Sequence, residues 1–184
     1  SLQTLRSWYR KHQSIQALQS FEKRVYLFCD EFTNYNDAHI GIKAIQLLNK
    51  LGYEVIIPHH VESGRTWLSK GLEASKALAK HALMVDEFIV REIEKGNIRR
   101  EQFKSASSKI LLHGHCQQKA VGNLAATVSM LSLPEGHIVE TIPSGCCGMA
   151  GSFGYEKEHY DVSMQIGELV LLPKVRKHQG QCTI

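Results

Sequence analysis

Two adjacent cysteines, Cys146 and Cys147, stand between glycines in the stretch Ser144–Gly154, and the whole 184-residue chain has only five cysteines. A lone buried cysteine serves as a small hydrophobic side chain, but a vicinal pair helps neither strand alternation nor helix packing. Glycines on both sides let the backbone approach a bound group closely. The stretch therefore indicates a site that presents thiolates, either to a metal or cluster or for dithiol redox chemistry. The alternative is a glycine-rich turn whose cysteines are incidental.

A third cysteine, Cys116, ends the short apolar run that starts at Lys109. Ligands of open parallel sheets bind beyond the carboxyl ends of the strands, where Cys116 and the vicinal pair are expected to converge. Three thiolates from two loops suit a soft metal. Iron–sulfur clusters typically take four cysteine thiolates, and zinc often takes four thiolate or imidazole ligands. The sequence lacks the paired CxxC segments of common structural zinc sites, which counts against zinc without excluding it.

Two histidines, His113 and His115, flank Gly114 just before Cys116. Either imidazole could ligate a metal or donate a hydrogen bond to a cluster sulfur. The ordinary alternative is a structural hydrogen bond at the end of a strand. Both histidines are therefore candidates for residues that surround the metal site and contact its cysteine ligands.

The hydrophobic pattern predicts an α/β protein in which strands alternate with helices. In the first half it predicts strands at Val25–Cys29 and Tyr53–Ile57, a polar loop over 30–37, and helices at Ala38–Leu51, Thr66–Lys80 and His81–Glu94. In the second half it predicts strands at Lys109–Cys116 and Ile138–Ile142 and a helix at Gln118–Leu131. We interpret this as two tandem pseudo-repeated strand-helix-strand-helix (Rossmann-like) halves with parallel sheets.

The repeat also sets the expected domain limits. We expect an N-terminal helix or arm over 1–22, a degenerate repeat over 23–95, a linker over 96–108, and a repeat with the cysteine site over 109–184. Cys29 ends the first strand as Cys116 ends the third, and Glu62 and Ser63 fall where the second half has its cysteine pair. Only the second half kept the cysteine pair.

Charge and composition narrow the class of protein. The formal charge of +4 is spread along the chain, and its densest basic cluster, around Arg99 and Arg100, is better explained as a solvated face than as a nucleic-acid footprint. No apolar run approaches the roughly 18 residues of a membrane span. An odd cysteine count with a vicinal pair does not fit a secreted disulfide framework. We expect a cytoplasmic protein, and the alternative is a protein attached peripherally to the inner face of the membrane.

These motifs resemble a known family. The cysteine pattern is similar to the cysteine-rich CCG domain found in heterodisulfide reductase and in the iron–sulfur subunits of glycolate, lactate and glycerol-3-phosphate oxidoreductases. The chain resembles still more closely the carboxyl-terminal iron–sulfur portion of bacterial proteins that begin with a FAD-linked oxidase domain. The resemblance covers most of 25–176 and rests on Phe28–Asp37, Glu62–Arg65, Ser69–Gly71, His113–Lys119 and Ser144–Tyr160.

The resemblance implies a 4Fe-4S electron-transfer domain. A FAD-linked dehydrogenase domain, elsewhere in the same polypeptide or complex, would oxidise a 2-hydroxy acid such as D-lactate or D-2-hydroxyglutarate, and the cluster would pass electrons to an acceptor. This chain would not oxidise substrate alone. Ligation would fall on Cys116, Cys146 and Cys147, with Cys182 as the remaining cysteine near the end.

The chain departs from the family pattern in three places. Cys29 lacks thiolate partners because Glu62 and Ser63 replace the cysteine pair of a first site. The chain carries less sequence around Lys80 than the family usually does, and it differs after Arg176. Two other functions stay open: a structural zinc module that docks the flavin domain, and a thiol-disulfide redox domain that uses Cys146 and Cys147.

Overall fold

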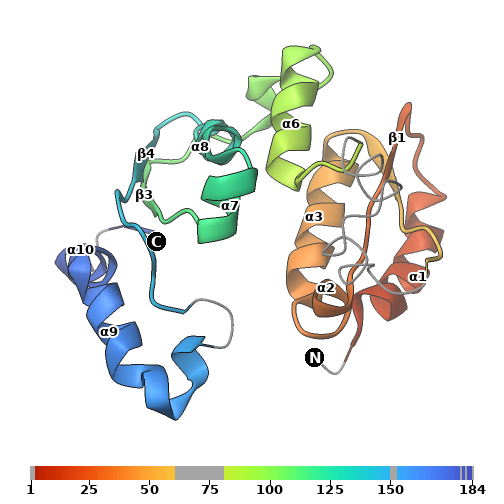
Figure 1. Ribbon diagram of the computed structural model, residues 1–184. Helices are drawn as coiled ribbons and strands as arrows, with labels where there is room; N and C mark the ends of the chain where they lie inside the picture. Colours follow the sequence, from red (N-terminus) through yellow and green to blue (C-terminus); the bar gives the residue numbers. More distant parts are fainter. Residues whose placement is uncertain (1–2, 61–80, 150–152, 179, 181, 184) are drawn as a thin grey trace. The chain divides into compact units, whose positions relative to one another are not determined.

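The computed structural model describes residues 3–60, 81–149, 153–178, 180 and 182–183 (Figure 1). The chain separates into two compact units, Ser1–Leu83 and Met84–Ile184. Each unit contains one two-stranded parallel sheet among its described residues. The two units are therefore described one at a time.

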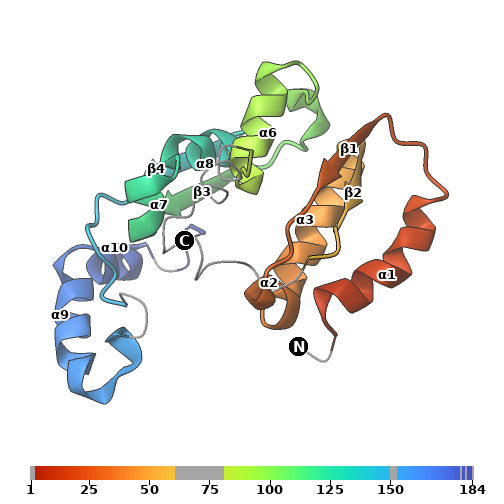
Figure 2. The same cartoon turned by 45° about the vertical axis from the view of Figure 1, so that its right-hand side comes forward.

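The first unit surrounds the strands β1 (Lys23–Tyr26) and β2 (Tyr53–Ile56), which pair in parallel. Its described helices are α1 (Leu5–Gln16), α2 (Glu31–Tyr35) and α3 (Ala38–Lys50). Figure 2 shows β1 and β2 side by side with α3 running along them. Leu5, Ile45 and Val55 are fully buried, so α1, α3 and β2 share one core.

Helix α1 closes the outer edge of β2 with side chains. Gln16 Oε1 accepts the Val55 N–H at 3.0 Å, while Gln16 Nε2 and the Tyr9 hydroxyl donate to the Val55 carbonyl at 3.3 and 2.7 Å. An open strand edge leaves backbone groups unpaired, and here two side chains satisfy them in place of another strand. Near the start of α1, Arg6 Nη1 donates to the Pro58 carbonyl at 3.3 Å, so this end of the helix lies beyond the carboxyl end of β2.

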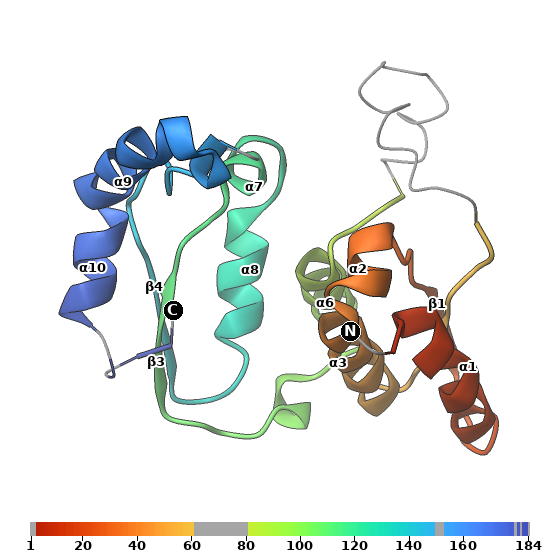
Figure 3. The same ribbon diagram turned by 90° about the horizontal axis from the view of Figure 1, so that it is seen from below.

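The second unit is built on β3 (Ser108–Leu112) and β4 (His137–Thr141), again a parallel pair. Its other elements are α6 (Val85–Glu94), η1 (Arg100–Gln102), α7 (Cys116–Val121), α8 (Leu124–Leu131), η2 (Phe153–Tyr155), η3 (Lys157–His159), α9 (Tyr160–Leu169) and α10 (Leu171–Lys177). Figure 3 shows the β3–β4 pair between α8 on one side and α9 and α10 on the other. The backbone of Thr183 adds a single parallel bridge beside Ile110.

The α/β class and the parallel strands are confirmed, whereas the tandem Rossmann-like halves are not, so the repeat stays a prediction. The predicted polar loop over 30–37 is wrong, because Asp30 caps a short helix there: its Oδ1 accepts the Thr33 N–H at 2.7 Å. The predicted single helix over 118–131 is two helices, because Asn123 caps a new start at α8 by accepting the Ala126 N–H.

Two further differences concern where elements lie. Strand β3 ends at Leu112 rather than at Cys116, which instead begins α7. Helix α6, which the sequence pattern grouped with the first half, packs on α8 in the second unit, where Thr127 donates a hydrogen bond to Asp86. The predicted helix 66–80 and residues Glu62 and Ser63 lie outside the described residues. The domain limits proposed from the sequence stay a prediction.

No helix in the described part of the chain is both long enough and apolar enough to cross a membrane.

Candidate functional site

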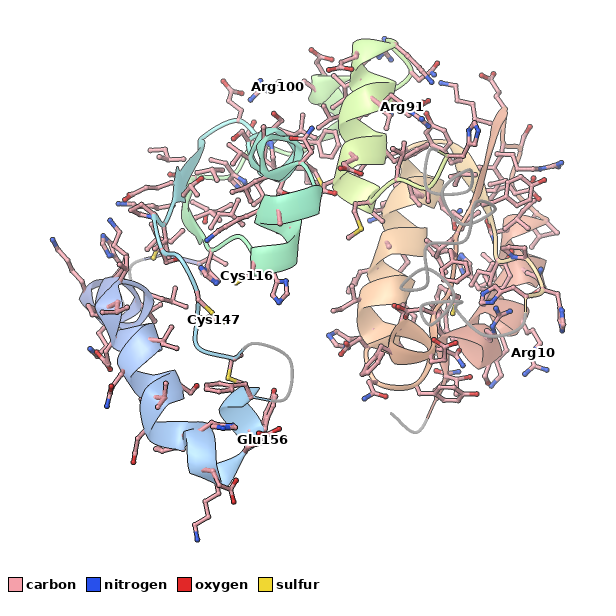
Figure 4. The ribbon with its side chains drawn as sticks, viewed as in Figure 1. Arg10, Arg91, Arg100, Cys116, Cys147 and Glu156 are labelled. Carbon is pink, nitrogen blue, oxygen red and sulfur yellow. The ribbon has the colours of Figure 1, made fainter. Side chains whose placement is uncertain are left out.

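Cys116 and the vicinal cysteines meet beyond the carboxyl ends of β3 and β4. Cys116 begins α7, is exposed, and has its Sγ 3.9 Å from the Gly145 carbonyl oxygen (Figure 4). The pKa of the Cys116 thiol is raised, first by its hydrogen bond with the Cys146 thiol, then by desolvation and by the charges of Cys146 and Cys147. The structure therefore places Cys116 within hydrogen-bonding distance of Cys146 and close enough to Cys147 to feel its charge, and none of the three cysteines forms a disulfide.

The turn after Cys147 requires glycine. Gly148 has φ +90°, and a Cβ built there would lie 2.2 Å from the carbonyl oxygen of Ser163 on α9. The Ser163 hydroxyl donates to the Gly148 carbonyl at 3.0 Å, and the Gly148 N–H points back to Cys146 Sγ at 3.3 Å. A backbone N–H aimed at sulfur stabilises the thiolate over the thiol. Helix α9 thus fixes a turn that supplies a donor to Cys146.

Lys119 ties the cysteine loop to α7, and sequence reasoning missed it. Its ammonium donates to the carbonyls of Ser144 and Gly145, the second at 3.1 Å. The same positive charge lowers the pKa of Cys116, although the causes that raise it are larger. Because residues three apart share a helix face, the position of Lys119 one turn after Cys116 was the available signal.

His113 supports the same loop from the end of β3. Its Nδ1 lies 2.6 Å from the Ser144 hydroxyl, a hydrogen-bonding contact just after the end of the strand. Burial, and then the charges of Lys119 and His115, lower the pKa of His113, so its imidazole is neutral at physiological pH. Its Nε2 is buried and has no hydrogen-bond partner in the described structure. His115 is exposed.

Cys182 lies elsewhere in the second unit. Its thiol donates to the His178 carbonyl at 3.5 Å, and its neighbour Thr183 exchanges backbone hydrogen bonds with Lys109 and Leu111. A strand advances about 3.3 Å per residue, so Cys182 sits on the order of 10 Å short of the carboxyl end of β3. The structure does not bring it to the other three cysteines, and its role as a ligand stays a prediction.

The donor chemistry of the site fits a soft metal, although the side chains do not form a closed coordination set. No group of three or more His, Cys, Asp or Glu side chains in the described ranges is arranged to hold a metal ion. Thiolate sites commonly take their final geometry when the metal binds and the protons leave. Cys116, Cys146 and Cys147 would supply three of the four thiolates that a cluster usually takes, and this ligand set stays a prediction.

Cys29, the candidate in the first unit, has different surroundings. It is 2% exposed, and its Sγ lies 3.9 Å from both the Asp30 carbonyl and Asn34 Oδ1. Burial is the largest cause that raises the pKa of this thiol. The other two residues of this predicted first site, Glu62 and Ser63, lie outside the described residues, so the structure shows Cys29 alone.

The chain is similar to two dehydrogenase-related proteins, although no protein-family model and no solved structure matches it. It is 25% identical to a subunit of the anaerobic glycerol-3-phosphate dehydrogenase of Escherichia coli (strain K12), over 91% of this chain and 53% of that protein. It is 23% identical to the D-2-hydroxyglutarate dehydrogenase of the same strain, over 85% of this chain and 20% of that protein.

The chain thus spans about half the length of the first relative and a fifth of the second. The alignment with the first relative runs over 214 residues, more than the 184 of this chain, so that relative carries internal segments with no counterpart here. The expectation that sequence is missing around Lys80 stays a prediction, because the alignment length does not locate these segments. The similarity relates this chain to dehydrogenase proteins, but identities of 23% and 25% do not assign it to a family.

Proposed function

We propose that the second unit is an iron–sulfur electron-transfer unit of a FAD-linked dehydrogenase. The observation that carries this proposal is the convergence of Cys116, Cys146 and Cys147 beyond the carboxyl ends of β3 and β4. Similarity to a glycerol-3-phosphate dehydrogenase subunit and to a D-2-hydroxyglutarate dehydrogenase supports it from a second direction. A bound cluster, of the 4Fe-4S type in this proposal, would supply one-electron transfer.

The residues around the cysteines prepare them for ligation. Lys119 holds the loop of Ser144 and Gly145 against α7 and places a positive charge near the thiols. The Gly148 N–H donates to Cys146 Sγ and so favours its deprotonated, ligating form. A fourth thiolate, from Cys182, requires the Thr183 bridge beside β3 to open. Hydrogen bonds to sulfur are among the features that set cluster potentials.

The partners follow from the same proposal. A FAD-linked dehydrogenase domain, in the same polypeptide or complex, would oxidise a 2-hydroxy acid such as D-lactate or D-2-hydroxyglutarate, and the cluster would deliver electrons to an acceptor. The chain alone would not oxidise substrate. We place it in the cytoplasm, where thiols stay reduced, or peripherally at the inner membrane face.

The test is to reconstitute the full chain with iron and sulfide without oxygen and to measure bound iron, acid-labile sulfide and the visible spectrum. We expect a broad absorbance that bleaches on reduction. Cys146→Ser should lose most of the iron, whereas the matched control Cys29→Ser, in the other unit, should keep it. Zinc as the retained metal, or equal iron in both variants, would overturn the proposal; zinc would favour a structural docking module.

The hydrogen bond between the thiols of Cys116 and Cys146 favours one second candidate, a thiol-disulfide redox domain. In that case a dithiol, rather than a cluster, would exchange electrons with a disulfide substrate. Reduction of the disulfide would then survive chelation of metals and stop after alkylation of the cysteines. Activity that chelation abolishes would exclude this candidate.

A further inference from the structure

We propose that the first unit binds a small zwitterion of the amino-acid type, with its carboxylate on Arg6 and its ammonium on Asp30 and Glu31. A cavity of about 360 Å³ lies beyond the carboxyl ends of β1 and β2, where open parallel sheets bind ligands. Its lining includes Arg6, Cys29, Asp30, Glu31, Asn34 and His60. The volume falls within the usual range for small-molecule pockets. This inference is independent of the metal proposal.

Arg6 is held in place before any ligand arrives. Its backbone N–H donates to Asn34 Oδ1 at 3.0 Å, Nη1 donates to the Pro58 carbonyl at 3.3 Å, and Nη2 lies 2.7 Å from His60 Nε2. The His60 ring in turn stacks on Phe28, with centroids 4.4 Å apart. A guanidinium has five N–H donors, so these side-chain contacts leave others to receive a carboxylate. A prepositioned arginine loses little side-chain entropy on binding.

The opposite charge lines the same cavity. Asp30 and Glu31 follow β1 directly, and Asp30 is fixed because its Oδ1 accepts the Thr33 N–H at 2.7 Å. Burial is the largest cause that raises the pKa of Cys29, and among the charges Arg6 lowers this pKa while Asp30 and Glu31 raise it. All three charges therefore act on one thiol of the cavity lining.

This arrangement of charge selects the class of ligand. A metal cation would meet the Arg6 guanidinium, and no group in the described ranges is arranged to hold one. A simple anion would meet two carboxylates, and an apolar ligand would strip water from Arg6, Asp30 and Glu31 without replacing its hydrogen bonds. A zwitterion satisfies both signs at once.

The test is calorimetric titration of the full chain, with metal removed by a chelator, using serine as the probe. Two analogues each lack one charge: ethanolamine has no carboxylate, and 3-hydroxypropionate has no ammonium. We expect saturable binding of serine and at least tenfold weaker binding of both analogues. Because the protein is metal-free, failure here leaves the iron–sulfur proposal untouched, and the reverse also holds.

The variants separate this site from unspecific charge effects. Arg6→Met should weaken serine binding at least tenfold, whereas Arg10→Met, an exposed arginine on the same helix (Figure 4), should leave it unchanged. Glu31→Gln, a change at an exposed residue, should weaken the binding of serine more than the binding of 3-hydroxypropionate. If circular dichroism shows that Arg6→Met unfolds, the result for Glu31→Gln decides the test. Absence of saturable serine binding, equal binding of the analogues, or equal loss in Arg10→Met would overturn the proposal.

Discussion

In each of the two sheets a cysteine follows the first strand of the pair, but the side chains around that cysteine differ. Cys29 follows β1, is buried, and shares its cavity with Arg6 and two carboxylates. Cys116 follows β3, is exposed, forms a hydrogen bond with the thiol of Cys146, and lies within the electrostatic influence of Cys147. Similar strand–helix connections thus present a charged cavity in one unit and a cluster of thiols in the other. What the neighbouring loop supplies, rather than the sheet, decides the chemistry.

The edges of the two sheets are closed in different ways as well. Side chains of α1 satisfy the outer edge of β2, whereas the backbone of Thr183 pairs with β3. The first closure depends on the identity of Gln16, and the second depends on the main chain. Substitutions can therefore test the two units separately.

The largest effect is expected in the turn after the vicinal cysteines. Gly148→Ala should destabilise the second unit by about 2 kcal/mol or more, because the residue has positive φ and its Cβ would collide with the Ser163 carbonyl. Gly145→Ala is the matched control: its Cβ meets nothing within 4 Å, and we expect a change within about 0.5 kcal/mol. Urea unfolding measures both, and equal stabilities would contradict the geometry of this turn.

The next effect concerns the edge of β2. Gln16→Leu should cost about 1–3 kcal/mol, because the buried N–H of Val55 would lose its partner. Gln13→Leu, on the exposed side of α1, should change stability by less than about 0.5 kcal/mol. Thermal or urea unfolding of the two variants decides the matter; if Gln16→Leu is as stable as Gln13→Leu, side chains do not close this edge.

A smaller effect should appear in the reactivity of Cys116. The ammonium of Lys119 lowers the pKa of this thiol, so Lys119→Met should raise the pKa further and slow alkylation at a given pH. The pH midpoint of iodoacetamide labelling, followed by mass spectrometry, should move upward. Lys104→Met, a change at an exposed residue, should leave the labelling midpoint unchanged.

Lys119→Met also removes the contact of the ammonium with the loop of Ser144 and Gly145. In reconstituted protein, the loss of this contact should weaken metal binding by about tenfold.

The smallest effect belongs to Glu140 on β4, which pairs with Lys174 at 2.6 Å and Lys109 at 3.2 Å. Hydrogen bonds from Lys174 and then Lys109 lower the pKa of this exposed carboxyl. Its contribution to stability is therefore present above its unfolded pKa and is lost as pH falls through the lower, folded pKa. Glu140→Gln should reduce the melting temperature slightly at neutral pH and not at all in strong acid. An equal difference at both pH values would count against this ion pair.

Periodicity in the sequence predicted the helices and strands well where they are long or apolar. The predicted helix at 38–51 corresponds to α3, and the predicted strand at 53–57 corresponds to β2. Errors occurred where one polar side chain decides the local structure: Asp30 starts α2, and Asn123 starts α8. Single capping bonds of this kind carry no periodic signal.

The sequence indicated the cysteines of the candidate site, but it did not indicate the residues that hold their loop in place. Cys116, Cys146 and Cys147 were found from residue type and position. Lys119 was missed because a lone lysine on a short helix resembles any solvated residue. The cavity around Arg6 was missed because its residues come from separate places in the chain, and only folding brings the start of α1 to the end of β1.

The single bridge formed by Thr183 makes one amide a reporter of local opening. The Leu111 N–H donates to the Thr183 carbonyl, and with this segment in place Leu111 is 1% exposed. Hydrogen exchange at that amide requires the tail to leave, whereas other amides of β3 that pair with β4 need the sheet itself to open. The exchange rate of Leu111, compared with theirs, therefore measures how readily the segment that bears Cys182 detaches.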